Sequence, residues 1–193
     1  MKTLKTIITT TLLFFSGSIS FAQESTKLHI DSFYSNKSEH LIYSEIYEFD
    51  SLSQEDLNTK IKNWAGLHFV NMKEVLVSET KDQMVFCYLT EDFFMKTLTT
   101  TYYSWYFRLS IQIKDNKIKV SIYDDGNALW SRSDQYPTPA RKYKFSVNFN
   151  EDGTSMKMYT KGMLEVKKSC VKLSNDINNS IKTAKLDTKK NDW

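Results

Sequence analysis

The strictest constraint on the fold is an alternation of apolar and polar residues in two neighbouring segments. Its apolar members are Trp105, Phe107, Leu109, Ile111 and Ile113, then Ile118, Val120 and Ile122. A period of two sends successive side chains to opposite faces of a β-strand. We therefore predict strands at 102–113 and 118–124, joined through an Asp115-Asn116 turn that tolerates positive φ angles. The chain must build an antiparallel sheet with one buried face and one face in contact with water.

A capped helix is predicted at residues 53–65. Its apolar side chains Leu57, Ile61 and Trp64 recur at i, i+4 and i+7 and form one stripe. Ser53 is a good N-cap, although Asp56 occupies the capping-box position where Glu or Gln is usual. Gly66 suits the left-handed residue that ends many helices, with Leu67 folding back onto the stripe. The stripe has to pack on a partner, and we predict that this partner is the buried face of the sheet.

The remaining elements complete an α+β pattern. Further strands are predicted at 41–49, 74–80 and 84–90. After a loop at 125–140, the alternation resumes at 141–149, which we interpret as an additional strand or an extended flap. A second long helix is predicted from about residue 155, with Gly162 marking a break near its start. Its apolar stripe comprises Met163, Val166, Cys170, Leu173, Ile177 and Ile181.

The start of the chain has the composition of a signal peptide. Lys2 and Lys5 precede an apolar run at 7–15, and Ser20 and Ala22 supply small residues at −3 and −1 of a cleavage site. The run is short for a membrane span of about 20 residues, and a retained N-terminal anchor is the alternative. We therefore expect an exported protein, periplasmic or secreted, with no integral membrane span after cleavage.

Cleavage of residues 1–22 from the 193-residue chain would leave 171 residues, enough for one domain with its own core. We divide them into an N-terminal lead-in at 23–40, one domain at 41–186 and a frayed tail at 187–193. The removed segment holds two lysines and no acid, so 24 basic and 23 acidic side chains remain. A net charge this small is no argument for nucleic acid or an anionic membrane as a partner.

Several of these features occur together in one known family. They are Ser51-Leu52-Ser53 at the helix start, Trp64 near its end, Phe69 shortly after, and the hairpin at 106–124. On these features, residues 47–124 resemble a family of exported bacterial proteins known as a domain of unknown function with a TBP-like fold. The resemblance implies a curved antiparallel sheet with two helices on one face, and it brings no catalytic residues. TATA-box proteins bind DNA with paired repeats and phenylalanine wedges; this chain has one unit, so no nucleic acid is expected.

The ionisable residues form no recognised catalytic or metal-binding motif. His29, His40 and His68 are too far apart in sequence for the short spacings of zinc ligands. The Asp-Asp-Gly-Asn segment at 124–127 lacks the alternating ligands and terminal Glu of a calcium loop. Neither a glycine-rich phosphate loop nor a nucleophile elbow is present. We therefore expect no metal, no cofactor and no enzymatic activity.

The two cysteines allow two interpretations. Cys87 lies in the apolar run 85–89 and Cys170 on the stripe of the second helix. A disulfide between them would tie that helix to the sheet of an exported protein, whereas two buried free thiols are the alternative. Both faces of the strand are apolar, and a shift of one residue in register would turn Cys87 away from the helix. Both outcomes stay open at this point.

The water-contacting face of the hairpin is the surface with most functional promise. Its candidate binding residues are Tyr106, Arg108, Gln112, Lys119 and Tyr123. Tyr and Arg are enriched in binding hot spots because they combine apolar area with directed polar groups. An ordinary solvated sheet face is the alternative interpretation of the same residues.

Taken with the export signal, these features predict a non-catalytic binding or interaction module of the bacterial cell envelope. Its partner would be an envelope protein or a small ligand. One alternative is an enzyme whose catalytic groups lie in the segments 91–101 or 125–140. Another is a self-assembling envelope component.

Overall fold

The computed structural model describes residues 28–36, 38–89, 93–96, 100–133 and 141–184. The signal peptide predicted at 1–22 and the tail predicted at 187–193 lie outside the described residues.

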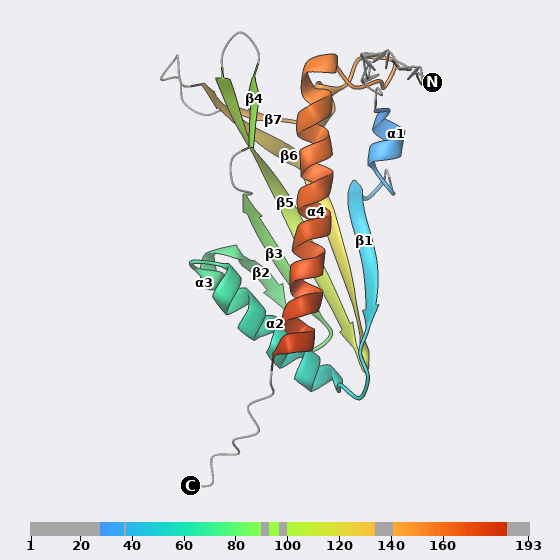
Figure 1. The fold of residues 1–193 in the computed structure, drawn as a ribbon, viewed down its shortest axis with the longest axis vertical. Coiled ribbons are helices and arrows are strands. Elements are labelled where there is room, and N and C mark those ends of the chain that lie inside the picture. Colours follow the sequence, from blue (N-terminus) through green and yellow to red (C-terminus); the bar gives the residue numbers. More distant parts are fainter. Residues whose placement is uncertain (1–27, 37, 90–92, 97–99, 134–140, 185–193) are drawn as a thin grey trace, which may run out of the picture.

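Seven strands in the described part of the chain form one antiparallel sheet (Figure 1). Their bounds are β1 (Leu41–Glu48), β2 (Leu76–Glu79), β3 (Gln83–Leu89), β4 (Phe93–Lys96), β5 (Thr100–Lys114), β6 (Lys117–Ser133) and β7 (Arg141–Tyr143). The order across the sheet is β1-β6-β5-β3-β2, and in addition β4 pairs with β5 and β7 with β6. The β5–β6 hairpin is therefore the centre to which the other strands attach.

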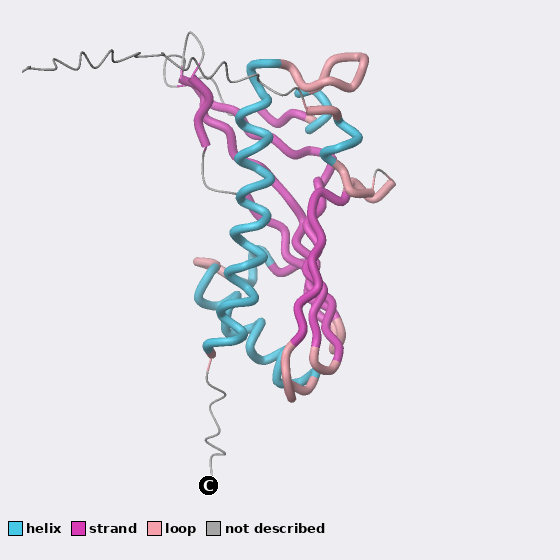
Figure 2. The backbone as a smooth tube through the Cα atoms, turned by 45° about the vertical axis from the view of Figure 1, so that its right-hand side comes forward, coloured by secondary structure: helices cyan, strands magenta, loops and turns pink. Residues whose placement is uncertain are grey.

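The longer helices cover one face of this sheet. The helical segments are α1 (Ile30–Phe33), α2 (Gln54–His68), α3 (Met72–Val75), α4 (Lys157–Thr183) and the 3₁₀ turn η1 (Phe145–Asn148). Trp64 of α2 contacts Phe86 of β3, and Ser174 of α4 is 2.9 Å from the Tyr47 hydroxyl of β1. Figure 2 shows the twisted strands beside α4. The predicted α+β architecture, a curved antiparallel sheet with two helices on one face, is confirmed.

The central hairpin has the register that its alternation predicts. Leu109 lies opposite Ile122, and Ile111 lies opposite Val120; all four side chains are fully buried on the helix-covered face. In the turn, Asn116 has a φ of 60°, the left-handed conformation expected there. The apolar residues of the alternating pattern thus lie on the face of the hairpin that packs under the helices.

Strand β6 continues well beyond the predicted end at residue 124. Trp105 pairs with Leu129, while Phe107 pairs with Asp124, so the register shifts between them. The turn-forming segment around Gly126 is therefore accommodated as a β-bulge inside a 17-residue strand. The loop predicted at 125–140 is wrong up to Ser133, because β5 also extends and offers a backbone partner.

Helix α2 starts as predicted and ends differently. Ser53 and Asp56 form a complete capping box, in which each side chain accepts from the other residue's backbone N–H. The helix passes through Gly66 to His68 without a left-handed residue, and Leu67 is 92% exposed. Phe69 closes the helix instead: its N–H donates to Ala65 O, and its ring packs against Trp64.

Three further segments differ from the predicted pattern. The strand predicted at 74–80 begins as the short helix α3 and becomes β2 only at Leu76. The strand or flap predicted at 141–149 is a three-residue strand followed by η1. Strand β4 was not predicted. In each case pairing with a neighbouring strand, not local propensity, sets where the strand lies.

Helix α4 confirms the predicted buried stripe. All six apolar stripe residues from Met163 to Ile181 are buried, and they form part of the single hydrophobic core. The predicted break at Gly162 is wrong, because the helix runs unbroken through 27 residues. One glycine costs only about 1 kcal/mol relative to alanine, which the packing of so long a stripe outweighs.

The N-terminal segment is not the loose lead-in predicted at 23–40, at least from residue 28 onward. The His29 ring donates from Nε2 to Asp152 O at 3.0 Å, and Ile30 N–H donates to Gly153 O at 2.8 Å. Gly153 has a φ of +79°, and a Cβ there would lie 2.7 Å from the His29 ring. The turn before α4 therefore requires glycine both for its backbone conformation and for its contact with His29.

Candidate ligand-binding site on the open face of the sheet

The face of the sheet that lies away from α2 and α4 carries the candidate site. Two short side chains, Ser110 and Ser121, stand directly opposite each other in its centre. The Ser121 hydroxyl lies 3.3 Å from that of Ser44 on β1. Because serine is short, the larger side chains around these positions stand higher than the centre of the face.

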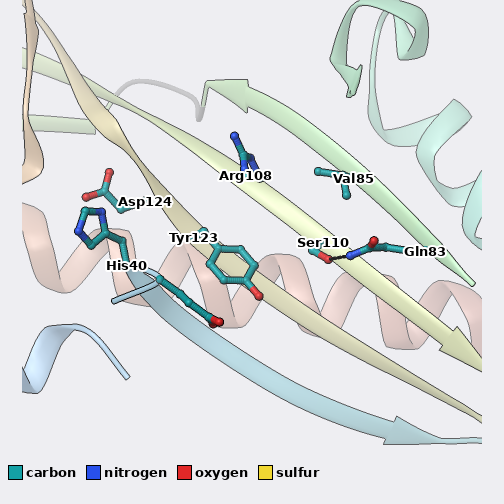
Figure 3. Close-up of a pocket in the computed structure, with 8 residues that line it drawn as sticks. His40, Gln83, Val85, Arg108, Ser110, Tyr123 and Asp124 are labelled. Atoms are coloured by element: carbon teal, nitrogen blue, oxygen red, sulfur yellow. Dashed lines mark hydrogen bonds between the residues drawn. The ribbon is translucent and has the colours of Figure 1, made fainter. Parts of the chain in front are cut away.

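A shallow hollow of about 600 Å³ lies on this face (Figure 3). It is lined by Gln83 and Val85 of β3, Arg108 and Ser110 of β5, Tyr123 and Asp124 of β6, and Glu39 and His40 before β1. Figure 3 shows α4 behind the strands, on the other side of the sheet from these side chains. Four segments that are distant in sequence thus meet in one site, and the term "pocket" refers below to this hollow.

The middle of the pocket combines one paired amide, one cation and one aromatic ring. Gln83 Nε2 donates to Ser110 Oγ at 2.9 Å, which holds the amide across β3 and β5. Arg108 lies directly opposite Tyr123 in the β5–β6 register. The Arg108 side chain is exposed and that of Tyr123 is half-buried. The pocket therefore presents a guanidinium beside a phenol ring.

The end of the pocket near β1 is held by the half-buried Tyr34. Tyr34 donates from its hydroxyl to Asp124 Oδ2 at 2.7 Å, and its ring stacks on His40 with centroids 5.4 Å apart. Burial, and then the charge of Asp124, raise the pKa of Tyr34 far above its ordinary value, so the hydroxyl stays protonated as a donor. His40 has a φ of 51°, which is uncommon for a non-glycine residue, and its carbonyl accepts from Asp124 N–H.

The five predicted binding residues all belong to the open face, but the pocket includes only two of them. Arg108 and Tyr123 line it. Gln112 and Lys119 lie opposite each other nearer the hairpin turn, and Tyr106 pairs with Leu89 beside the register shift. The structure therefore brings two of the five into one concave site and spreads the other three along the face.

Six lining residues were not predicted: Glu39, His40, Gln83, Val85, Ser110 and Asp124. Ser110 was recognised only as a polar-face position of the hairpin. The sequence does not show which face of β3 is buried, because both of its faces are apolar. No local sequence pattern indicates that the turn before β1 belongs to a site. Only the pairing of β3 with β5 places Gln83 and Val85 beside Arg108, and only the pairing of β1 with β6 brings Glu39 and His40 to the same hollow.

The structure decides between the two interpretations of the cysteines. Cys87 lies opposite Arg108 and therefore on the open face, whereas Cys170 belongs to α4, on the other side of the sheet, and is 1% exposed. No disulfide joins the two cysteines. The register of β3 points the Cys87 side chain away from the helix. Cys170 matches the predicted buried thiol, whereas Cys87 is only partly buried.

We expect the two thiols to differ in reactivity. Burial raises the pKa of Cys170 to about 12, so this thiol is both shielded and protonated. Brief treatment of the native protein with iodoacetamide at pH 8 should therefore add one label, at Cys87, and the Cys87→Ser variant should take up none. Denatured, unreduced protein should take up two labels by mass measurement. No labels in that sample would show that a disulfide joins the two cysteines after all.

The histidines outside the pocket have structural contacts. His68 stacks on Trp64 with centroids 4.9 Å apart, and its Nδ1 lies 3.4 Å from Asp176 Oδ2. His29 joins the N-terminal segment to the turn at Asp152. Across the described part of the chain, no group of three or more His, Cys, Asp or Glu side chains is placed to hold a metal ion.

A single twisted antiparallel sheet, with its helices on one face and the other face open, defines a TBP-like α+β protein. Residues 43–124 match the model of the family described as "Domain of unknown function (DUF4468) with TBP-like fold". This part of the chain is therefore similar to that family, in agreement with the resemblance of residues 47–124.

Two solved structures share the fold. A TBP-like protein from Parabacteroides distasonis is 13% identical; the match covers 76% of this chain and 96% of that one, with a TM-score of 0.57. A DUF4468 family protein from Bacteroides ovatus is 11% identical, with 83% and 95% covered and a TM-score of 0.57. No curated protein matches the chain. At such identities the likeness concerns the fold, and function has to be argued from the site.

Proposed function

We propose that the protein is a non-catalytic binding module that holds a small polar ligand in the pocket on the open face of its sheet. The observation that carries this proposal is the convergence of Arg108, Tyr123 and the Gln83–Ser110 pair from three strands on one hollow. Its volume, about 600 Å³, lies within the usual range of small-molecule sites. A ligand there would meet an aromatic ring and directed polar groups together.

The charges of the lining suggest the chemical class of this ligand. Arg108 is an exposed cation whose guanidinium geometry suits a carboxylate. Glu39, also exposed, brings a carboxylate to the same lining from the turn before β1. A molecule with both an acidic and a basic group, such as a short peptide or an amino-acid derivative, is complementary to the two charges of the lining.

The hydrogen bonds of the lining favour binding over catalysis. Two of them join Gln83 to Ser110, and Asp124 to Tyr34 beside the lining. Such pairs fix side chains in place, whereas a nucleophile needs a base oriented toward it. An enzyme with groups on the segments 91–101 or 125–140, and a self-assembling component, remain the alternative functions.

We further propose that the protein acts in the cell envelope, in the periplasm or outside the cell. The support is the signal-like composition of residues 1–22. None of the helices in the described ranges is long and apolar enough to cross a membrane.

The pocket can be tested by titrating the full chain with dipeptides, N-acetyl amino acids and neutral sugars, followed by NMR shifts and calorimetry. We expect a dipeptide to perturb the Ser110 and Tyr123 amides, and Arg108→Ala or Tyr123→Ala to weaken its binding at least about tenfold. Arg108→Ala should keep the free energy of unfolding within about 0.5 kcal/mol, as exposed substitutions usually do. Circular dichroism melts establish that the variant at the half-buried Tyr123 also folds.

Lys119→Ala is the matched control. It removes a cation from the same face but outside the pocket, and it should leave dipeptide affinity unchanged. Equal loss in Arg108→Ala and Lys119→Ala would indicate a general charge effect. Full binding in both Arg108→Ala and Tyr123→Ala would refute the pocket, and sugar binding without dipeptide binding would refute the ligand class.

A further inference from the structure

Helix α4 has an outward side that the proposed pocket does not use. Six exposed residues follow one another there at spacings of one to four: Lys157, Lys161, Leu164, Lys168, Val171 and Lys172. With 3.6 residues per turn, they fall on one stripe opposite the buried stripe. We call these six residues the lysine row. It extends over about 22 Å of a helix that rises 1.5 Å per residue, and Figure 1 shows α4 in front of the sheet along this length.

The lysine row contains four cations and no acidic residue. The two acidic residues of α4, Glu165 and Asp176, lie beside the row or beyond its end. Glu165 pairs with Lys168 at 2.7 Å, in an exposed contact that contributes little. Asp176 instead accepts from Trp64 Nε1 at 2.8 Å. Although the whole chain carries a net charge of only +3, positive charge is concentrated on this side of one helix.

Two aliphatic residues interrupt the lysines. Leu164 is 42% exposed and Val171 is 43% exposed, two turns apart on the same stripe. Apolar side chains flanked by lysines, whose stems are themselves apolar, are typical of helices that lie at a membrane interface. A phosphate backbone or another polyanion would attract the lysines but give these two side chains no apolar environment.

We propose that the lysine row docks the protein onto the surface of an anionic lipid bilayer. The four ammonium groups would lie among the lipid phosphates, with Leu164 and Val171 at the boundary with the acyl chains. The pocket lies on the opposite face of the sheet, so it stays open to solvent in the docked state. This docking does not depend on which ligand the pocket holds.

Co-sedimentation of the full chain with vesicles tests the proposal. The vesicles contain phosphatidylcholine alone, or phosphatidylcholine with 30% phosphatidylglycerol, at 50 mM and 300 mM salt. We expect binding to the anionic vesicles at low salt and a large loss at high salt, because salt screens these charges. Binding to the neutral vesicles measures what the apolar N-terminal run contributes, and it is subtracted in every arm.

The triple variant Lys161→Gln, Lys168→Gln, Lys172→Gln should weaken binding about 100-fold, since each lysine near an anionic surface contributes about fivefold. The matched control carries Lys73→Gln, Lys81→Gln and Lys114→Gln, three exposed lysines elsewhere with the same change in net charge. It should weaken binding less than about threefold. Circular dichroism melts establish that both variants fold.

Leu164→Ser with Val171→Ser distinguishes a bilayer from a polyanion. This pair should weaken vesicle binding severalfold and leave binding to inorganic polyphosphate unchanged. Equal losses in the two triple variants would overturn the lysine row as the docking surface. So would the absence of binding to anionic vesicles at 50 mM salt. Vesicle binding that is indifferent to the serine pair would instead assign the row to polyanions and overturn the bilayer proposal.

Discussion

Replacing Trp64 by alanine is expected to lower the free energy of unfolding by about 3–5 kcal/mol. The side chain is 3% exposed and lies where α2 meets both the sheet and α4. Its ring makes edge contacts with Phe69 and Phe86, with centroids 5.6 and 6.2 Å apart. Truncation would leave a cavity among aromatic rings whose backbones are held by α2 and β3, so the site can collapse only partly.

Urea unfolding followed by far-ultraviolet circular dichroism measures this loss without relying on tryptophan fluorescence. Trp64→Phe separates packing from hydrogen bonding, because it keeps a ring but removes the donor to Asp176 Oδ2. We expect it to cost only about 1 kcal/mol, since the Asp176 side chain is half exposed and water can replace the lost donor. A loss below 1 kcal/mol for Trp64→Ala would show that α2 is not anchored through this residue.

Replacing Lys60 by methionine is expected to cost about 2–3 kcal/mol. Lys60 is a charged residue of α2 with only 5% exposure. Its ammonium donates to Ile181 O at 3.0 Å and to Ala184 O, both at the C-terminal end of α4. These carbonyls belong to the last turn, where a helix leaves acceptors unpaired and the macrodipole favours a cation. Methionine keeps most of the apolar stem but removes the donors.

Lys62→Met is the control for this prediction. Lys62 lies on the same helix, but its ion pair with Glu79 is partly exposed, so its loss should cost less than about 1 kcal/mol. Amide hydrogen exchange should also show faster opening of the last turn of α4 in Lys60→Met only. Unchanged or higher stability would mean that burying this ammonium costs as much as its hydrogen bonds contribute.

Much of the fold could be predicted because its signals are local. The alternation at 105–122 requires only that neighbouring side chains take opposite faces of a strand. The capping box of Ser53 and Asp56 involves residues three apart, and the α4 stripe follows from the helical repeat. These features do not depend on contacts with distant segments of the chain.

The candidate site was less predictable. Arg108 and Tyr123 were found because the hairpin itself places them opposite each other on its open face. Gln83 and His40 reach the same pocket only through strand pairing across the sheet. The lysine row is not evident from the sequence for a different reason: a near-zero net charge does not show how the charges are distributed over the folded surface.

By itself, the sequence determined the two helical stripes, the central hairpin and the face of that hairpin that is buried, since each depends on the spacing of residues close together in the chain. Tertiary structure alone decided the extension of β6 past Gly126 and the direction in which Cys87 points. Both depend on the register of one strand against another, and a shift of a single residue exchanges the two faces. Strand register is fixed by contacts between distant segments, which no local pattern in β3 or β6 specifies.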